Sequence, residues 1–367
     1  MSHAQLVERA KSLIDDLART PRFAGSAEEA HARVQIRAEL ERAGFMCREI
    51  EFEYSQWLGR WGPPVVSILL ALIVFAAGTL TLRGALYTAP AVVVAMYAAV
   101  RLSTDTIRRG WILDFPWLRT RAKNLEAKRG QPRVWLIAHV DSKSQTMPML
   151  LRILGAVALQ LSGALVFAGA LAFLKWGEGV RPLIVTAQLL AAFGAIGAGL
   201  CFVTNRSPGA VDNASGVAAV TLAAQSGNAP HDLGVLITSG EELGLAGALA
   251  WGRAALVPVR VLNCDTIDEV GEFRCMYTGR QPMPLTLATQ TVAKRLGDDL
   301  KTGHVIPGLL ADSIAFAVSG WPAITLSRGT LATLARIHTT RDNSAALTGE
   351  GTARASLLLS AIAKELS

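Results

Sequence analysis

The chain has 367 residues and a mass of 39.0 kDa, which is enough for one large α/β domain with extra elements or for two average domains. Hydrophobic residues make up 51% and charged residues only 18%, below the ~25% usual for soluble globular proteins, so a disordered chain is excluded and an ordinary cytosolic enzyme is disfavoured. The net charge of +7 could suggest nucleic acid, but the basic residues concentrate beside apolar stretches, so we expect no nucleic-acid partner.

The first sixty residues have the pattern of a water-soluble domain. Leu6, Ala10 and Leu13 recur at helical spacing and predict an amphipathic helix. Ser26 is expected to cap a second helix, and residues 45–54 are expected to form a strand.

Four stretches of the chain then contain no charged side chain. An apolar helix of about 20 residues spans a ~30 Å hydrocarbon layer, so each stretch predicts a transmembrane helix. The alternative is four long buried helices in a soluble protein. The second stretch is the shortest and contains Pro90 near its middle. The four stretches are residues 61–82, 84–100, 153–174 and 182–205.

The connections between these stretches pair them into two hairpins that interrupt one soluble domain twice. The first turn lies around Arg83 and the second covers residues 175–181. The expected organisation is therefore one soluble domain in three parts (1–60, 102–147 and 206–367) with transmembrane hairpins at 61–101 and 148–205.

Basic residues are distributed unequally on the two sides of the predicted membrane. By the positive-inside rule, the side with more of them is cytoplasmic. We therefore expect a multi-pass protein of the inner or plasma membrane, with the lipid bilayer as a partner and the soluble domain in the cytoplasm. The far side holds Arg83, Lys175 and Arg181, whereas the common side holds Arg60, Arg101, Arg108, Arg109, Arg119, Arg121, Lys123, Arg152 and Arg206.

The soluble parts alternate between strand-like and helix-like runs. Strands are expected over two runs after the first hairpin, and after the second hairpin a small-residue helix at 217–225 precedes further alternating elements. Such alternation indicates an α/β fold with a central, mostly parallel sheet flanked by helices.

Three of the hydrophobic strands end in groups that can carry chemistry. One ends in His139 with Asp141 two residues on, one in Glu241 and Glu242, and one in Asp265. In open α/β sheets, ligands bind outside the carboxyl ends of the strands. Several carboxylates gathered there repel one another unless cations lie among them, which points to a metal site. Alternatively, each polar residue follows a strand simply because strands end at the surface.

Two further residues join this set. Asp212 lies in D-N-A-S-G just before a helix of small residues, and His338 lies in R-I-H-T-T-R-D-N before the last helix. Nitrogen and oxygen ligands of this kind suit Zn²⁺, with cobalt or manganese as possible replacements.

At this point the residues resemble a known family. Five motifs appear in the order seen in the co-catalytic zinc aminopeptidases of clan MH, peptidase family M twenty-eight, and the chain looks like a membrane-embedded member. The soluble parts carry the resemblance, and the four apolar stretches lie outside it. The motifs are His139-x-Asp141, Asp212-Asn213-Ala214-Ser215-Gly216, Glu241-Glu242-Leu243-Gly244, Asn263-x-Asp265 and His338-Thr339-x-x-Asp342.

The resemblance implies a role for each residue. Asp212 would bridge two zinc ions, with His139 and Asp265 completing one site and Glu242 and His338 the other. Glu241 would be the general base, and Asp141 would orient His139 from behind. The resemblance also implies a cis peptide bond between Asp212 and Asn213.

The implied activity is a zinc metallopeptidase, a hydrolase most similar to aminopeptidases, acting on a peptide substrate. Two departures qualify it: a hairpin separates H-x-D from D-N, and Ala311-Asp312-Ser313 replaces the S-D-H of the family. The hairpins suggest hydrophobic or membrane-associated peptides.

Three other functions compete with the peptidase. A non-catalytic membrane scaffold is disfavoured because all the presumed ligands are present, and a glutaminyl-cyclase-like acyltransferase because both outer ligand pairs are retained. A transporter is disfavoured because the spans contain no charged residue that would mark an ion path, only Gln160 and Gln188. The sequence leaves the oligomeric state, the substrate and the choice between exo- and endopeptidase open.

Overall fold

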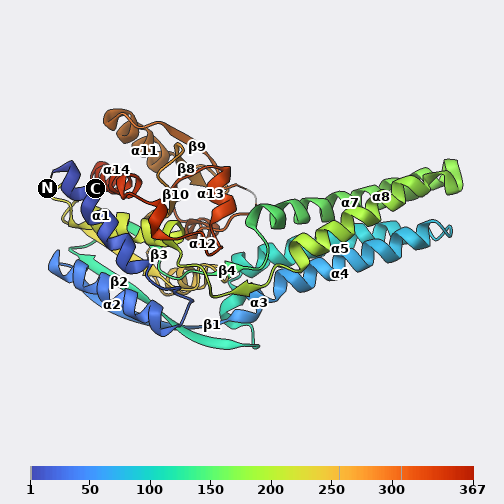
Figure 1. Ribbon diagram of the computed structural model, residues 1–367, viewed down its shortest axis with the longest axis horizontal. Helices are drawn as coiled ribbons and strands as arrows, with labels where there is room; N and C mark the ends of the chain where they lie inside the picture. The colour runs from blue at the N-terminus through green and yellow to red at the C-terminus, as the bar shows by residue number, and fades with distance from the viewer. Residues whose placement is uncertain (1, 256, 307) are drawn as a thin grey trace. The chain divides into compact units, whose positions relative to one another are not determined.

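The computed structural model describes residues 2–255, 257–306 and 308–367, and the chain divides into two compact units. The sheet unit comprises Met1–Gln56, Gly110–Ser144 and Asn205–Ser367, and the helical unit comprises Trp57–Arg109 and Gln145–Thr204. Each unit is therefore built from segments that lie far apart in the sequence (Figure 1).

An eight-stranded mixed sheet forms the centre of the sheet unit, in the order β1-β2-β6-β3-β7-β10-β8-β9. The four middle strands β6, β3, β7 and β10 are parallel, whereas β2 runs antiparallel to β6 and β8 runs antiparallel to β10. The expected mostly parallel sheet is thus confirmed for the middle of the sheet, with antiparallel strands added towards both edges. The strands are β1 (Met46–Ser55), β2 (Arg119–Arg129), β3 (Val134–His139), β6 (Leu233–Thr238), β7 (Arg260–Ile267), β8 (Phe273–Tyr277), β9 (Leu300–His304) and β10 (Ala323–Arg328).

Helices cover both faces of this sheet. All six residues of β3 and all six of β6 are buried, as is typical of central parallel strands that read as continuous apolar runs. Helices α9 and α14 pack on β3 and β7, whereas α10 and α12 pack against each other. The helices of the unit are α1 (His3–Leu17), α2 (Ala27–Arg42), α6 (Trp111–Asp114), α9 (Ser215–Gln225), α10 (Ala246–Ala254), α11 (Met283–Leu296), α12 (Asp312–Val318), α13 (Leu331–Arg336) and α14 (Glu350–Leu366).

The early sequence predictions for this unit agree closely with the structure. The side chain of Ser26 accepts a hydrogen bond from the backbone N–H of Glu29 and so caps α2, as expected. Strand β9 and helix α13 were not predicted, because neither segment is a continuous apolar run.

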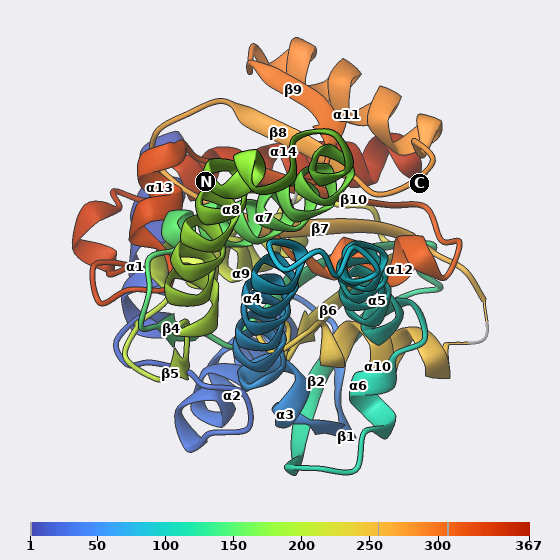
Figure 2. The ribbon, with the colours of Figure 1, turned by 90° about the vertical axis from the view of Figure 1, so that its right-hand side faces the viewer.

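The helical unit is a bundle built mainly from four long helices, which Figure 2 shows nearly end on. Its core contains small and aliphatic side chains such as Val74, Val92 and Val166. Helix α7 packs closely on the segment after α8, since a Cβ atom at Gly155 would lie 3.0 Å from the backbone nitrogen of Ala198. The helices are α3 (Gln56–Arg60), α4 (Gly62–Thr81), α5 (Thr88–Arg108), α7 (Met149–Trp176), η1 (Gly177–Val180), α8 (Arg181–Gly194) and η2 (Ala195–Gly199).

The prediction of four apolar membrane-crossing helices is supported only in part. Two helical stretches are long and apolar enough to cross a membrane: Gly62–Thr81, and Met149–Gly199, which comprises α7, a turn at η1, and α8 packed back against α7. Helix α5 does not qualify, because it begins at Thr88 rather than at residue 84 and extends through Arg101 and Asp105. The charged residues that were expected to follow the second stretch are therefore part of its helix.

Short elements complete the chain. Strands β4 (Ser144–Gln145) and β5 (Val203–Thr204) form a two-stranded sheet. Residues Ala210–Ala214 (η3) precede α9, and Ser344–Ala346 (η4) precede α14.

Candidate metal centre

The carboxyl ends of three parallel strands supply side chains to one region of the sheet unit. His139 is the last residue of β3, Asp265 lies near the end of β7, and Glu241 follows β6 after Ser239 and Gly240. Since β3 lies between β6 and β7, these three side chains are brought close together. Their ligand atoms all lie within 4.8 Å of one another, and all three residues are buried.

A second group of buried ligands consists of Asp212, Glu242 and His338. The Nε2 atom of His338 lies 3.0 Å from Asp212 Oδ2 and 3.1 Å from Glu242 Oε2. Asp212 also reaches the first group, because its other oxygen, Oδ1, lies 3.2 Å from His139 Nε2. The structure therefore brings all five predicted ligands together, with Asp212 between the two histidines.

The donor set fits divalent cations. The Nδ1 atom of His139 shares a hydrogen bond with the backbone carbonyl oxygen of Asp141, so Nε2 is the ring atom that faces the carboxylates. Among the described residues, the buried Nε2 atoms of His139 and His338 have no partner in hydrogen-bond geometry. Buried polar atoms without partners are rare, and imidazole nitrogen with carboxylate oxygen is a donor set that Zn²⁺ accepts.

The turn before α9 fixes the position of Asp212. The peptide bond between Asp212 and Asn213 is cis, as the resemblance implied. The Asn213 side chain accepts from the backbone N–H of Gly216 at 3.1 Å and donates to the carbonyl of Cys264 at 3.0 Å. A Cβ atom at Gly216 would lie 2.5 Å from that carbonyl oxygen, which explains why glycine is needed here.

Two buried aspartates hold the backbone that presents the ligands. The Asp141 carboxylate accepts from the backbone N–H groups of Glu241 at 3.3 Å and of Glu242 at 3.2 Å. The Asp342 carboxylate accepts from the N–H groups of Val211 at 2.7 Å and of Asp212 at 3.2 Å. Asp141 thus contacts His139 through its carbonyl oxygen, while its carboxylate, 3.7 Å from His139 Nδ1, orders the loop with both glutamates.

Lys143 is a residue of this site that the sequence reasoning missed. Its Nζ atom lies 2.9 Å from Glu242 Oε2 and donates to the Glu242 carbonyl oxygen at 2.7 Å. The lysine is buried, and its contacts fix the carboxylate that faces His338. No local pattern marks it, since its burial depends on a contact with a residue 99 positions away.

Charges inside the centre are strongly interdependent. Burial alone would raise the pKa of the Asp212 carboxyl, but the adjacent imidazoles of His139 and His338 outweigh it and hold that pKa below its usual range. Burial would lower the pKa of His139, yet the carboxylates of Glu241, Asp212 and Asp265 raise it well above its usual value. Burial, together with the negative charge of its neighbours, raises the pKa of Glu241. A cation among these groups would replace the protons that they otherwise hold.

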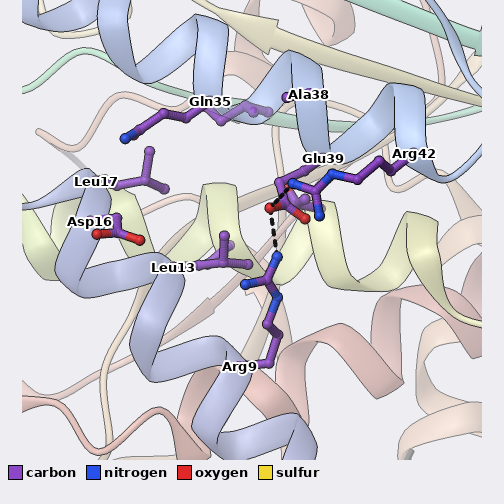
Figure 3. A pocket seen from close by; sticks show the side chains of 11 residues that line it. Arg9, Leu13, Asp16, Leu17, Gln35, Ala38, Glu39 and Arg42 are labelled. Carbon is purple, nitrogen blue, oxygen red and sulfur yellow. Dashed lines mark hydrogen bonds and ion pairs between the residues drawn. The ribbon is translucent and has the colours of Figure 1, made fainter.

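A cavity of about 280 Å³ lies elsewhere in the sheet unit, between α1, α2 and α9. Figure 3 shows Glu39 between the side chains of Arg9 and Arg42, each 2.5 Å from Glu39 Oε1. The Glu39 carboxylate in this cavity is already paired with two guanidinium groups, and none of the predicted metal ligands lines the cavity. The cavity is therefore not the candidate site.

Comparison with known proteins agrees with the motif resemblance. The sequence model described as Peptidase family M28 matches residues 189–363, a range that includes Asp212, Glu241 and His338 but not His139. A comparison with curated protein sequences finds no match.

Solved structures share the fold at low sequence identity. The zinc aminopeptidase BSAP from Bacillus subtilis is 13% identical, with a TM-score of 0.58 over 98% of this chain and 95% of that chain. An aminopeptidase from Aneurinibacillus sp. strain AM-1 is 13% identical, with a TM-score of 0.55 over 97% and 92%. The glutaminyl cyclase of Fimbriiglobus ruber is also 13% identical, with a TM-score of 0.55 over 98% and 95%. These structures confirm the α/β fold with a central sheet flanked by helices.

Proposed function

We propose that this protein is a zinc-dependent metallopeptidase, most similar to aminopeptidases, that is anchored in a membrane. The observation that carries the proposal is the pair of buried ligand groups joined by Asp212, in which two imidazole nitrogens face carboxylates without hydrogen-bond geometry. The family match and the aminopeptidase structures support a hydrolase of the peptidase class.

His139 and Asp265 would hold one zinc ion and Glu242 and His338 the other, with Asp212 contributing to both. When bound, such ions polarise a scissile carbonyl and lower the pKa of an attacking water. The two ligand groups need both histidines in the neutral form, with Nε2 free for the metal. The hydrogen bond of His139 Nδ1 to the Asp141 carbonyl selects that form for one of them.

Glu241 is the residue that would move the proton. Its neighbour Glu242 is held by Lys143 and faces His338. The Oε2 atom of Glu241 lies 3.9 Å from His139 Nε2 and pairs with no lysine or arginine among the described residues. A carboxylate that is not committed as a ligand keeps its basicity, so Glu241 can take a proton from water and deliver it to the leaving amine. The loop bonds to Asp141 fix the two glutamates in these separate directions.

The helical unit supports membrane anchoring. Gly62–Thr81 and Met149–Gly199 have the length and composition of membrane-crossing helices, and the arginine-rich flanks favour a cytoplasmic sheet unit. Peptides that are hydrophobic or membrane-associated are the substrates that such an anchored enzyme would meet.

Hydrolysis of aminoacyl-arylamides by the purified full chain tests the activity. We expect zinc-dependent release of the arylamine by the parent and by the exposed control Glu8→Gln, and loss of at least 10²-fold in kcat with Glu241→Gln. Equal rates for Glu241→Gln and the parent would contradict the proposed base. Bound zinc with no turnover of any peptide would favour the non-catalytic scaffold.

A glutaminyl-cyclase-like acyltransferase is the second candidate, because solved glutaminyl cyclases share the fold as well as the aminopeptidases do, with TM-scores of 0.55 and 0.53. In that reaction the amine of an N-terminal glutamine attacks its own side-chain amide, and ammonia leaves. Glutaminyl-arylamide distinguishes the two: a peptidase releases arylamine from it, whereas a cyclase releases ammonia and retains the arylamide.

A further inference from the structure

Helix α7 of the helical unit leaves one long face uncovered. Its buried side contacts α4, α5 and α8 and consists largely of small residues. The opposite side repeats with spacings of four and three residues, which is the pattern of a coiled-coil seam. This α7 seam consists of the half-buried Ile153 and the exposed Val157, Gln160, Ala164, Phe167 and Leu171.

Gln160 is the polar member of the α7 seam. It is exposed, and it has no hydrogen-bond partner among the described residues. The other glutamine of the apolar stretches, Gln188 on α8, donates to the carbonyl oxygen of Phe75 and to the hydroxyl of Thr79, both at 3.2 Å. Of the two glutamines in the apolar stretches, Gln188 is therefore satisfied inside the unit and Gln160 points outward.

In a bilayer this outward position is unfavourable for an isolated copy. Gln160 lies seven residues beyond Ile153, or about 10 Å along the helix, so it falls well inside a ~30 Å hydrocarbon layer. Lipid tails offer no hydrogen bond to its amide, whereas a polar side chain on another helix does.

We propose that the α7 seam is a homodimer interface within the membrane, in which Gln160 of one copy hydrogen-bonds to Gln160 of a second copy. Two copies inserted with the same orientation run parallel, so a twofold axis along the membrane normal brings residue 160 against residue 160. A glutamine amide is both donor and acceptor, so it pairs with its own copy, and the flanking Val157 and Ala164 pack around the pair. The proposal rests on the membrane anchoring proposed above and is independent of the hydrolytic activity.

The test uses the full chain in membranes and in liposomes. Ala164→Cys lies in the α7 seam, and Leu154→Cys is the matched control, because Leu154 is 49% exposed on the same helix but outside the seam. Oxidation in membranes should join Ala164→Cys chains into a band of twice the chain mass and leave Leu154→Cys chains at the background given by the native cysteines. Single-molecule photobleaching over a range of protein-to-lipid ratios then gives the dimer dissociation constant.

We expect Gln160→Leu to weaken the dimer about three- to tenfold, and Gln188→Leu to leave association unchanged. Any of four results would overturn the proposal: monomers at every protein-to-lipid ratio, equal cross-linking at residues 154 and 164, an unchanged dimer dissociation constant for Gln160→Leu, or a cross-linked adduct with a different protein. Washing membranes with alkaline carbonate distinguishes failure of the dimer from failure of the membrane anchoring. If carbonate extracts the chain, both proposals are wrong, whereas a chain that stays in the membrane but is monomeric contradicts only the dimer. Arylamide hydrolysis is unaffected in either case.

Discussion

Replacing Asp141 with asparagine tests how the loop carrying Glu241 and Glu242 is held. Both carboxylate oxygens of Asp141 accept backbone N–H groups, and the residue is completely buried. Asparagine keeps the shape but offers one oxygen and one NH₂ group, so one buried N–H loses its acceptor, at a cost of about 1–3 kcal/mol. Because that loop delivers a metal ligand, we expect zinc affinity to fall about 10- to 100-fold.

Competitive titration of the zinc-free protein with a chromophoric chelator measures this change, with exposed Asp299→Asn as the control. Burial raises the pKa of the Asp141 carboxyl to about 7, so at pH 5.5 the parent is largely protonated there and resembles the asparagine variant. The ratio of affinities between parent and variant should therefore increase from pH 5.5 to pH 8. An equal affinity of Asp141→Asn and the parent at pH 8 would refute the role given to this carboxylate.

Three further predictions concern stability. Lys143→Met leaves the buried Glu242 carboxylate without its ammonium partner, so it should destabilise the zinc-free protein by about 3–5 kcal/mol and the zinc-loaded protein by much less. Thermal unfolding with and without zinc measures this difference. An equal loss of stability in both forms would contradict it. Arg22 is buried and donates to four backbone carbonyl groups. Arg22→Met leaves these acceptors without a donor and should lower stability by at least about 1–3 kcal/mol, and an unchanged unfolding temperature would argue against this arrangement. Burial raises the pKa of Asp342 to about 7, and neighbouring carboxylates raise the pKa of His139. The native state therefore holds more protons than the unfolded state between about pH 4 and 7, so the chelator-treated protein should unfold at a lower temperature at pH 8 than at pH 5.5. The opposite order would be inconsistent with these shifts.

The sequence indicated most of the sheet unit because its central strands are continuous apolar runs that end in polar residues. His139, Glu241 and Asp265 could be grouped from this pattern alone, since parallel neighbours carry them to one edge of the sheet. Asp212 and His338 could be added only as further candidate ligands, because each lies in an irregular segment whose place in space depends on long-range contacts. Their roles within the centre came from the resemblance to known motifs.

Other features depended on tertiary contacts that no local pattern specifies. The hydrogen bonds from Lys143 to Glu242 join residues 99 positions apart. Asp141 was expected to orient His139, and it does so through its backbone carbonyl oxygen. Its carboxylate instead accepts from the loop that carries the glutamates. In α5, the apolar pattern identified a helix but not its end, because helix propensity carries it past Arg101.

We propose that the two ligand groups hold two cations around Asp212. Crystals of the zinc-loaded full chain, with diffraction measured on both sides of the zinc absorption edge, show where zinc binds. We expect two anomalous peaks, one within bonding distance of His139 and Asp265 and the other of Glu242 and His338, with Asp212 touching both. Zinc bound at other side chains, or none bound at saturating concentration, would contradict it.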